Sequence, residues 1–335
     1  MFYKTTICLI GIYLVQSSSA LVAASSSKKI HYRVDVVETF ASDLGEGPHW
    51  DEKQQVLWHT DINTFRVCRL NVSSRVADCH QLSDLATLVH PYPDGQNLLV
   101  TQRNKMVRLN WQTKHVDVLA EVAPELKGRE RFNDGKADET GRLWMGTILN
   151  NDKGGIVPGK GNLYKWENGM FSKQATMFSI TNGMTWSYDN RLMYVNDSES
   201  HKIYVFDFDI EKGTLSNKRI LIDGYNSTDI TVNDRPDGLT RDKQGYLWAA
   251  ANKGGRVFRV DPSTGDVVDS IALPCPLTTT PVFGGPNFNE MFVTTAYGNG
   301  GPDQRAKYPT CGQTHRITAV DSDEFVGTVD YRPKP

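Results

Sequence analysis

The chain has 335 residues, 39% of them hydrophobic and 23% charged, which excludes an intrinsically disordered chain and a polytopic membrane protein. Its 37 Lys and Arg residues nearly balance its 39 Asp and Glu residues, so the net charge is −2. Nucleic-acid binding is therefore excluded as a main function. The 28 Gly, 15 Pro, 13 Phe, 13 Tyr and 7 Trp residues favour turns and strands over helices.

Residues 1–20 have the pattern of a secretory signal peptide. Lys4 precedes an apolar run at 7–15, and small residues follow the run. We expect cleavage after Ala20, with Ala24 as the second site. The alternative is an uncleaved anchor, although the run is shorter than a typical membrane span. The sequence therefore predicts a secreted, extracellular protein that has no membrane association after cleavage.

After a short linker at 21–30, one strand-rich pattern recurs along the chain. Each unit alternates apolar and polar residues between turns of Asp, Asn or Gly, and no segment keeps a helical period. The leading strand pairs cover 47–62, 88–102, 135–148, 183–197, 238–252 and 281–296. This spacing predicts an all-β fold, a six-bladed β-propeller formed by 31–335 as a single domain. A pair of β-sandwiches is the alternative.

Residues 31–40 alternate like a strand but precede the first unit. A propeller whose last blade lacks its outer strand would leave an open sheet edge. We therefore expect this segment to be the outer strand of blade six.

Signal cleavage removes Cys8 and leaves four cysteines, an even number in an oxidising compartment. Cys68 and Cys79 lie at equal distances from a predicted two-residue turn at 73–74, so they would face each other on adjacent strands and form a disulfide. Cys275 and Cys311 then pair by elimination. Free thiols are the alternative. Of three sequons, at Asn71, Asn196 and Asn226, the first and the last are the predicted glycosylation sites.

Oxygen-bearing side chains recur just before the first strand of several units. They are Glu46, Asn133 with Asp134, Asn182 and Asp237, and a glycine follows in each case. Equivalent positions in a propeller converge on the central channel, where buried carboxylates need a cation. Oxygen donors suit Ca²⁺, Mg²⁺ or Mn²⁺ better than a structural zinc. The alternative is that these residues only shape turns.

The same regions resemble one known family, that of senescence marker protein (regucalcin), gluconolactonase and luciferin-regenerating enzyme. The resemblance spans roughly 35–330 and is also seen with secreted insect members close to luciferin-regenerating enzyme. The matching motifs are LGEGP with WD at 44–51, RFNDGKAD at 131–138, GRLWMGT at 141–147, TNGMTWS at 181–187, PDGL at 236–239, GYLWAA at 245–250 and FGG at 283–285.

This resemblance implies a propeller with one divalent cation in its channel, most simply Ca²⁺, with Zn²⁺, Mg²⁺ or Mn²⁺ as alternatives. It implies that Glu46, Asn182 and Asp237 are the metal ligands and that Arg131 and Asn133 contact substrate. The family's acidic substrate contact has no counterpart here, and the aligned residue is Asn151, next to Asp152.

The function predicted from these residues is hydrolysis of a small lactone by a secreted, metal-dependent enzyme, which we expect to be a monomer. A bound cation polarises the lactone carbonyl, and Asp237 also accepts a proton from the attacking water. Asp197 is either a supporting partner of the site or an ordinary strand-end residue. His115 is a weaker candidate base. The alternative functions are a non-catalytic calcium- or ligand-binding propeller and a luciferin-regenerating-type enzyme acting on a non-sugar substrate.

Overall fold

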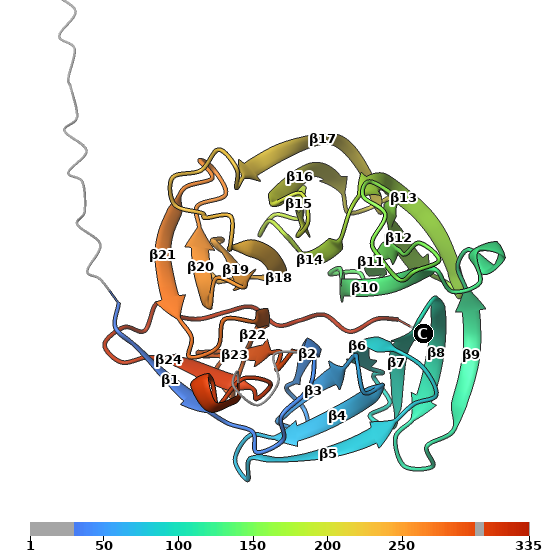
Figure 1. Ribbon diagram of the computed structural model, residues 1–335, viewed down its shortest axis with the longest axis horizontal. Coiled ribbons are helices and arrows are strands. Elements are labelled where there is room, and N and C mark those ends of the chain that lie inside the picture. Colours follow the sequence, from blue (N-terminus) through green and yellow to red (C-terminus); the bar gives the residue numbers. More distant parts are fainter. Residues whose placement is uncertain (1–29, 299–304, 335) are drawn as a thin grey trace, which may run out of the picture.

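The computed structural model describes residues 30–298 and 305–334, and it confirms a six-bladed β-propeller. Six four-stranded antiparallel sheets stand around a central channel, with the first strand of each blade innermost (Figure 1). The predicted signal peptide and all but the last residue of the linker lie outside the described residues. In the described ranges, no helix is long and apolar enough to cross a membrane.

The strands of the first three blades follow one another along the chain. Blade one contains β2 (Gly45–Asp51), β3 (Val56–Asp61), β4 (Arg66–Asn71) and β5 (Val76–Gln81). Blade two contains β6 (Ala86–Pro91), β7 (Asn97–Gln102), β8 (Lys105–Asn110) and β9 (Val116–Glu121). After a short 3₁₀ turn, η1 (Pro124–Leu126), blade three contains β10 (Glu130–Ala137), β11 (Leu143–Leu149), β12 (Gly161–Glu167) and β13 (Met170–Phe178).

The remaining blades repeat this order, except that the last blade takes its outer strand from the start of the chain. Blade four contains β14 (Thr181–Trp186), β15 (Leu192–Asp197), β16 (Lys202–Asp209) and β17 (Thr214–Asp223). Blade five contains β18 (Arg235–Arg241), β19 (Leu247–Asn252), β20 (Arg256–Val260) and β21 (Val267–Ala272). Blade six contains β22 (Thr278–Gly284), β23 (Glu290–Thr295), β24 (His315–Ala319) and β1 (Tyr32–Val36).

The predicted ring closure by the N-terminal strand is confirmed. β1 pairs antiparallel with β24, from Tyr32 opposite Ala319 to Val36 opposite His315. The first described strand therefore completes the sheet of the last blade, and the outer edge of β24 is covered.

The hydrophobic core is divided among the junctions between neighbouring blades. Each of six buried clusters combines side chains from two adjacent blades. Trp58, for example, packs with Leu98 and Val107 of the next blade, and Trp144 packs with Met193 of blade four. Removing such a fully buried tryptophan side chain costs about 3–5 kcal/mol in typical cores, so these contacts hold the first strands at defined positions around the channel.

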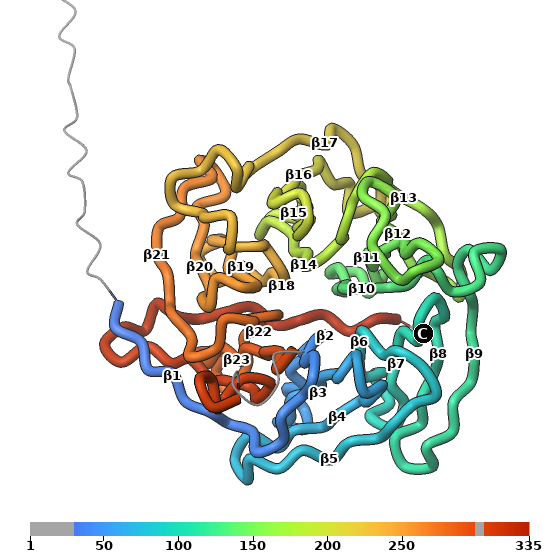
Figure 2. Tube along the Cα trace, in the orientation of Figure 1, coloured from blue at the N-terminus to red at the C-terminus, as the bar shows by residue number. Residues whose placement is uncertain are grey.

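The segment after β24 crosses one end of the channel, as the tube in Figure 2 shows. Gly327 bridges to Asp242, Tyr331 bridges to Ala137, and Arg332 pairs with Asp51 at 2.7 Å. These partners lie at or just beyond the C-terminal ends of β18, β10 and β2. The C-terminal segment 320–334 therefore covers the end of the channel at which the first strands finish.

The structure contains the two disulfides Cys68–Cys79 and Cys275–Cys311, the pairs expected from the sequence. Cys68 and Cys79 face each other on β4 and β5, as the register argument requires. The predicted two-residue turn was wrong, because the strands separate after Asn71 and the tip has four residues, 72–75. The Asn71 side chain accepts hydrogen bonds from the N–H groups of Ser73 and Ser74, which stabilises this wider turn.

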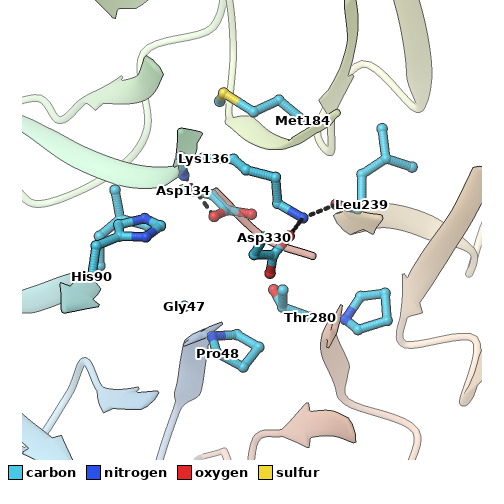
Figure 3. A pocket seen from close by; sticks show the side chains of 12 residues that line it. Gly47, Pro48, His90, Asp134, Lys136, Met184, Leu239, Thr280 and Asp330 are labelled. Atoms are coloured by element: carbon cyan, nitrogen blue, oxygen red, sulfur yellow. Dashed lines mark hydrogen bonds and ion pairs between the residues drawn. The ribbon is translucent and has the colours of Figure 1, made fainter. Parts of the chain in front are cut away.

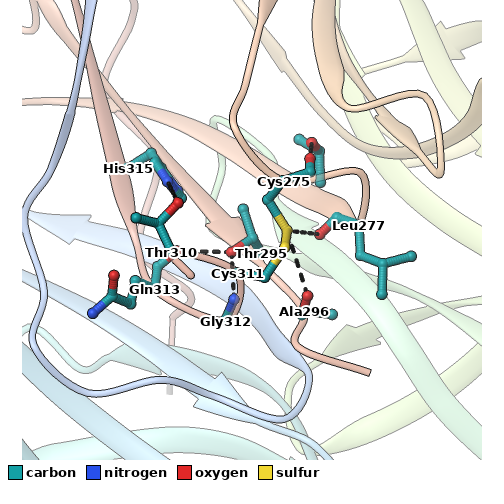
Figure 4. The surroundings of a disulfide bond; sticks show 10 residues. Cys275, Leu277, Thr295, Ala296, Thr310, Cys311, Gly312, Gln313 and His315 are labelled. Atoms are coloured by element: carbon teal, nitrogen blue, oxygen red, sulfur yellow. Dashed lines mark hydrogen bonds between the residues drawn. A yellow bond between two sulfur atoms is a disulfide. The ribbon is translucent and has the colours of Figure 1, made fainter. Parts of the chain in front are cut away.

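The second disulfide joins the loop before β22 to the residues that precede β24 (Figure 4). Cys275 and Cys311 are both buried. The Thr295 hydroxyl of β23 donates to the Gln313 carbonyl and accepts from the Gly312 N–H, both at 2.8 Å. These bonds hold the returning chain against blade six.

We predict that the two disulfides differ in their contribution to stability. Their sequence separations are 36 residues for Cys275–Cys311 and 11 for Cys68–Cys79. The chain-entropy model assigns about 4 and about 3 kcal/mol to loops of these lengths. The pair variant Cys275→Ala/Cys311→Ala should therefore lose about 1 kcal/mol more than Cys68→Ala/Cys79→Ala in urea unfolding. A larger loss in the second variant would contradict this ranking.

Candidate metal and substrate site

The oxygen-bearing residues singled out in the sequence lie inside the first strands, which corrects the expectation that they precede them. Every first strand has a register shift near its start, for example between Phe132 and Gly135, Thr181 and Met184, and Pro236 and Leu239. A β-bulge releases residues from regular pairing and redirects their side chains. The repeated shift therefore turns one or two side chains of each blade toward the channel.

The glycines that follow these residues are required by the close approach of neighbouring first strands. A Cβ at Gly183 would lie 2.1 Å from the Leu239 amide nitrogen, far inside contact distance. Gly47 has φ +54, and a Cβ there would lie 2.6 Å from the Thr87 carbonyl oxygen. Any side chain at these points would force adjacent blades apart and widen the site.

Three buried carboxylates interact at this level of the channel, Glu46 of β2, Asp134 of β10 and Asp237 of β18. Burial, together with the charges of Asp237 and Asp134, raises the pKa of Glu46 well above its usual range. Burial and then the Asp134 charge raise the pKa of Asp237 to about 8. Burial raises the pKa of Asp134 to about 6. The channel thus concentrates negative charge that the surrounding protein neutralises poorly.

Hydrogen bonds with residues on or next to neighbouring strands orient these groups. The Asn182 Nδ2 donates to Ser198 Oγ at 2.9 Å, and the Asn252 Nδ2 donates to Asp237 Oδ2 at 2.9 Å. Thr280 Oγ1 donates to Glu46 Oε2 at 2.7 Å. Each bond occupies one atom of the planar group and leaves its remaining oxygen available.

Two of the remaining oxygens, Asn182 Oδ1 and Asp237 Oδ1, are buried without a hydrogen-bond partner among the described residues. Unpartnered buried oxygens beside a carboxylate cluster fit a hard divalent cation such as Ca²⁺, Mg²⁺ or Mn²⁺. No three His, Cys, Asp or Glu side chains of the described ranges are grouped as a metal centre. The predicted ligands Glu46, Asn182 and Asp237 supply two carboxylates and one amide. Water or substrate would therefore have to complete the coordination shell of the cation.

Arg131 and Asn133, the predicted substrate contacts, adjoin the carboxylate cluster. The Arg131 Nη1 donates to Asn133 Oδ1 at 3.1 Å, and Asn133 Nδ2 donates to the Thr181 carbonyl at 3.1 Å. Burial and the charge of Arg103 lower the pKa of Arg131 to about 10, while Glu46 acts in the opposite direction. Among the described carboxylates, none forms an ion pair with Arg131.

Asn151 lies apart from the carboxylates, in an exposed loop that follows β11. Together with Arg131 it lines a cavity of about 470 Å³ at the channel end where the first strands begin. Asn151 Oδ1 accepts hydrogen bonds from the N–H groups of Lys153 and Gly155, at 2.9 and 3.0 Å. The neighbouring Asp152 is 89% exposed and faces Arg129 at 3.3 Å.

Deeper in the channel, the space narrows to a void of about 10 Å³, room for about one water molecule (Figure 3). Lys136 donates to the Leu239 carbonyl at 3.3 Å and pairs with Asp330 of the C-terminal segment at 3.0 Å. The buried rings of His49 and His90 meet with 3.2 Å between their Nδ1 atoms, and burial lowers the pKa of each to about 3. This end of the channel is therefore narrow and crossed by the C-terminal segment, whereas the cavity that Arg131 lines lies at the opposite end.

The weaker candidates of the sequence are placed outside this arrangement. Asp197 accepts the N–H groups of Ser179 and Ile180, at 3.0 and 2.9 Å, so it shapes the entry to β14. His115 is exposed next to the outer strand β9 and pairs with Asp117.

The sequons also differ in their surroundings. Asn71 and Asn226 are exposed, which leaves both accessible to glycosylation. Asn196 is fully buried, and its Nδ2 donates to the Asp237 carbonyl at 2.7 Å.

Sequence reasoning missed the residues that hold the predicted ligands, namely Ser198, Asn252 and Thr280. Each lies on or next to a neighbouring strand, and no spacing rule links it to its partner. Asp134 was included among the residues expected to converge on the channel but was not named as a metal ligand. Its place in the N-D-G triplet of β10, like the Asp237-Gly238 pair of β18, was the available signal.

Comparisons with known proteins identify the family and agree with the propeller fold. The model of the SMP-30/Gluconolactonase/LRE-like region matches residues 44–297. A regucalcin of Xenopus laevis is 33% identical over 290 residues, which cover 86% of this chain and 95% of that protein. The structure of a luciferin-regenerating enzyme superposes with a TM-score of 0.82 at 27% identity, covering 91% of this chain and all of that one. A calcium-binding regucalcin of Agrobacterium tumefaciens has the same fold, with a TM-score of 0.81 at 24% identity and coverage of 91% and 98%.

We predict that the protein becomes less stable as the pH rises when a chelator keeps it free of metal. The raised pKa values of Asp237 and Asp134, about 8 and about 6, mean that the folded protein binds protons which the unfolded chain has already released above pH 4. The melting temperature should therefore fall between pH 5 and pH 8, and Ca²⁺ should raise it more at pH 8 than at pH 5. Asp237→Asn should flatten both effects. Equal or greater stability of the chelated protein at pH 8 would contradict this assignment.

Proposed function

The chain belongs to the SMP-30/Gluconolactonase/LRE-like family, and from that premise we propose that it hydrolyses small lactones with one divalent cation in its channel. The observation that carries this proposal is the pair of buried, unpartnered oxygens on Asn182 and Asp237 beside Glu46. Arg131 lies near Glu46, is half-buried and forms no ion pair with a described carboxylate. A site with both an oxygen-rich floor and an unpaired guanidinium suits a cation together with an oxygen-rich substrate.

The chain's own residues would share the work of hydrolysis. Arg131 and Asn133 would hold the oxygens of the lactone, because the guanidinium presents several donors in a planar fork and the amide both donates and accepts. Asp237 would both hold the cation through Oδ1 and accept the proton of the attacking water. The hydrogen bond from Asn252 keeps that carboxylate in one orientation.

The reaction conserves its atoms without a further reactant. The water oxygen bonds to the lactone carbonyl carbon, the ring C–O bond breaks, and the proton taken by Asp237 passes to the alkoxide that leaves, which yields a hydroxy acid. When bound, the divalent cation polarises the carbonyl and favours the ionised form of its carboxylate ligands. Because the far end of the channel is closed by the C-terminal segment, substrate and product would use the same opening.

A second candidate function is cation binding without catalysis. The oxygens of Asn182 and Asp237 would serve a bound Ca²⁺ equally well in the absence of a substrate, and regucalcins are among the relatives. Arg131 favours the enzyme, because a purely cation-binding site gains nothing from a half-buried positive charge nearby. A luciferin-regenerating-type reaction on a non-sugar substrate would use the same opening.

We also propose that the protein is exported, acts as a monomer and carries glycans at Asn71 and Asn226. The two disulfides and the exposure of both asparagines support export. Mass spectrometry of protein from a secreting cell tests this, since it should show a new N-terminus after Ala20 or Ala24. A full-length N-terminus on cell-retained protein would contradict it.

We predict that Asp237→Asn lowers kcat by about 10²–10⁴-fold on any lactone that the protein hydrolyses, since this is the usual contribution of a positioned base. Arg131→Lys should raise KM more than it lowers kcat, because the planar fork is lost. The control is Glu211→Gln, the same acid-to-amide change at an exposed residue in the turn after β16. Its kcat and KM should equal those of the unchanged protein.

The measurement is steady-state hydrolysis of a lactone panel by metal-stripped and Ca²⁺-restored protein. We expect hydrolysis to be lost when the metal is removed and to be recovered when Ca²⁺ is added back. If the protein binds the cation but hydrolyses none of the lactones, the lactonase proposal is contradicted and cation binding without catalysis is the supported function.

A further inference from the structure

The channel opening is unusual in the charges that surround the predicted substrate contacts. The cavity of about 470 Å³ is lined by four cationic side chains, Arg103, Lys127, Arg129 and Arg131. All four lie at or near the channel end where the first strands begin, since Arg131 is the second residue of β10 and Arg103 follows β7. This side of the opening, formed by blades two and three, is the basic rim, whereas the floor of the channel is acidic.

The negative charges facing this rim do not balance it. Asp84 accepts a hydrogen bond from Arg103 Nε at 2.6 Å. Arg129 faces Asp152 at 3.3 Å, and because both side chains are exposed this contact is weak. Lys127 forms no ion pair within the described part of the chain, and neither does Arg131. Two of the four cations thus have no carboxylate partner.

The polar group that replaces the expected acid also favours a negative ligand. A carboxylate at position 151 would repel an anion, whereas Asn151 is neutral. Its Oδ1 is occupied by the N–H groups of Lys153 and Gly155, which leaves the Nδ2 group as the atom available to a ligand. The cavity therefore offers hydrogen-bond donors from Arg131, Arg129, Lys127 and Asn151.

Given the lactone hydrolysis proposed above, we propose that the preferred substrate is an anionic lactone. Its carboxylate or phosphate group binds the basic rim, while its ring reaches the acidic floor. Arg131 links the two regions, because it lines the cavity and interacts electrostatically with Glu46 of the acidic floor. Arginine forks match carboxylate and phosphate oxygens in pairs, and a cationic cleft concentrates anions before binding.

The test compares two lactones that differ only at one carbon, D-glucono-1,4-lactone and D-glucaro-1,4-lactone, the second carrying a carboxylate in place of the hydroxymethyl group. We expect kcat/KM to be at least about tenfold higher for the glucarolactone, with a preference that shrinks as salt is raised. The pair D-glucono-1,5-lactone and its 6-phosphate, measured alongside, shows whether phosphate serves as well as carboxylate.

Charge-reversal variants assign the preference to the rim. Lys127→Glu/Arg129→Glu should lower the ratio of the two kcat/KM values by about tenfold or more. The control, Lys53→Glu/Lys243→Glu, makes the same charge change in exposed turns at the opposite end of the channel and should leave the ratio unchanged.

The outcomes separate this inference from the proposed function. If each neutral gluconolactone is hydrolysed with a kcat/KM equal to or higher than that of its anionic counterpart, the inference is overturned, whereas the proposed lactone hydrolysis is supported. If no lactone is hydrolysed, calorimetric titration of the same pair decides. Tighter binding of glucarolactone that is lost in Lys127→Glu/Arg129→Glu would support the basic rim, and equal or absent binding would overturn it.

Discussion

The rest of the channel depends on the enforced proximity of three carboxylates that have little access to water. Glu46, Asp134 and Asp237 come from three blades, and each raises the electrostatic cost of ionising at least one of the others. Lys136, two residues after Asp134 in the chain, forms an ion pair with Asp330 of the C-terminal segment. The cluster therefore needs either protons or an added cation, and the unpartnered oxygens of Asn182 and Asp237 favour the cation.

That proximity follows from the architecture of the ring. The cores between blades hold the first strands, the bulges turn polar side chains inward, and glycines such as Gly183 allow neighbouring backbones to touch. Closure by β1 makes the ring continuous, and the C-terminal segment closes one end of the channel. The result is a channel that the C-terminal segment covers at one end, with an acidic floor and the basic rim on one side of its other end. A ligand that carries both a polarisable carbonyl and a negative group would contact both regions.

Local patterns were enough to predict much of this molecule from its sequence. Alternating residues between turns identified the blades, the short strand-like segment before the first unit identified β1, and equal spacing from a turn placed Cys68 opposite Cys79. Features that depend on contacts between distant segments were out of reach. The hydrogen bonds of Ser198 and Asn252 and the crossing of 320–334 are set by packing. For the same reason, the burial of Asn196 was not visible in its sequon.

The central claim is that one divalent cation binds where these strands converge. Anomalous diffraction from crystals of the protein saturated with Mn²⁺, followed by exchange into Ca²⁺, tests it most directly. The account predicts one peak per chain within bonding distance of Glu46, Asn182 Oδ1 and Asp237 Oδ1, and no such peak in crystals of Asp237→Asn. A channel without a peak at saturating cation, or a peak bound by other residues, would contradict it.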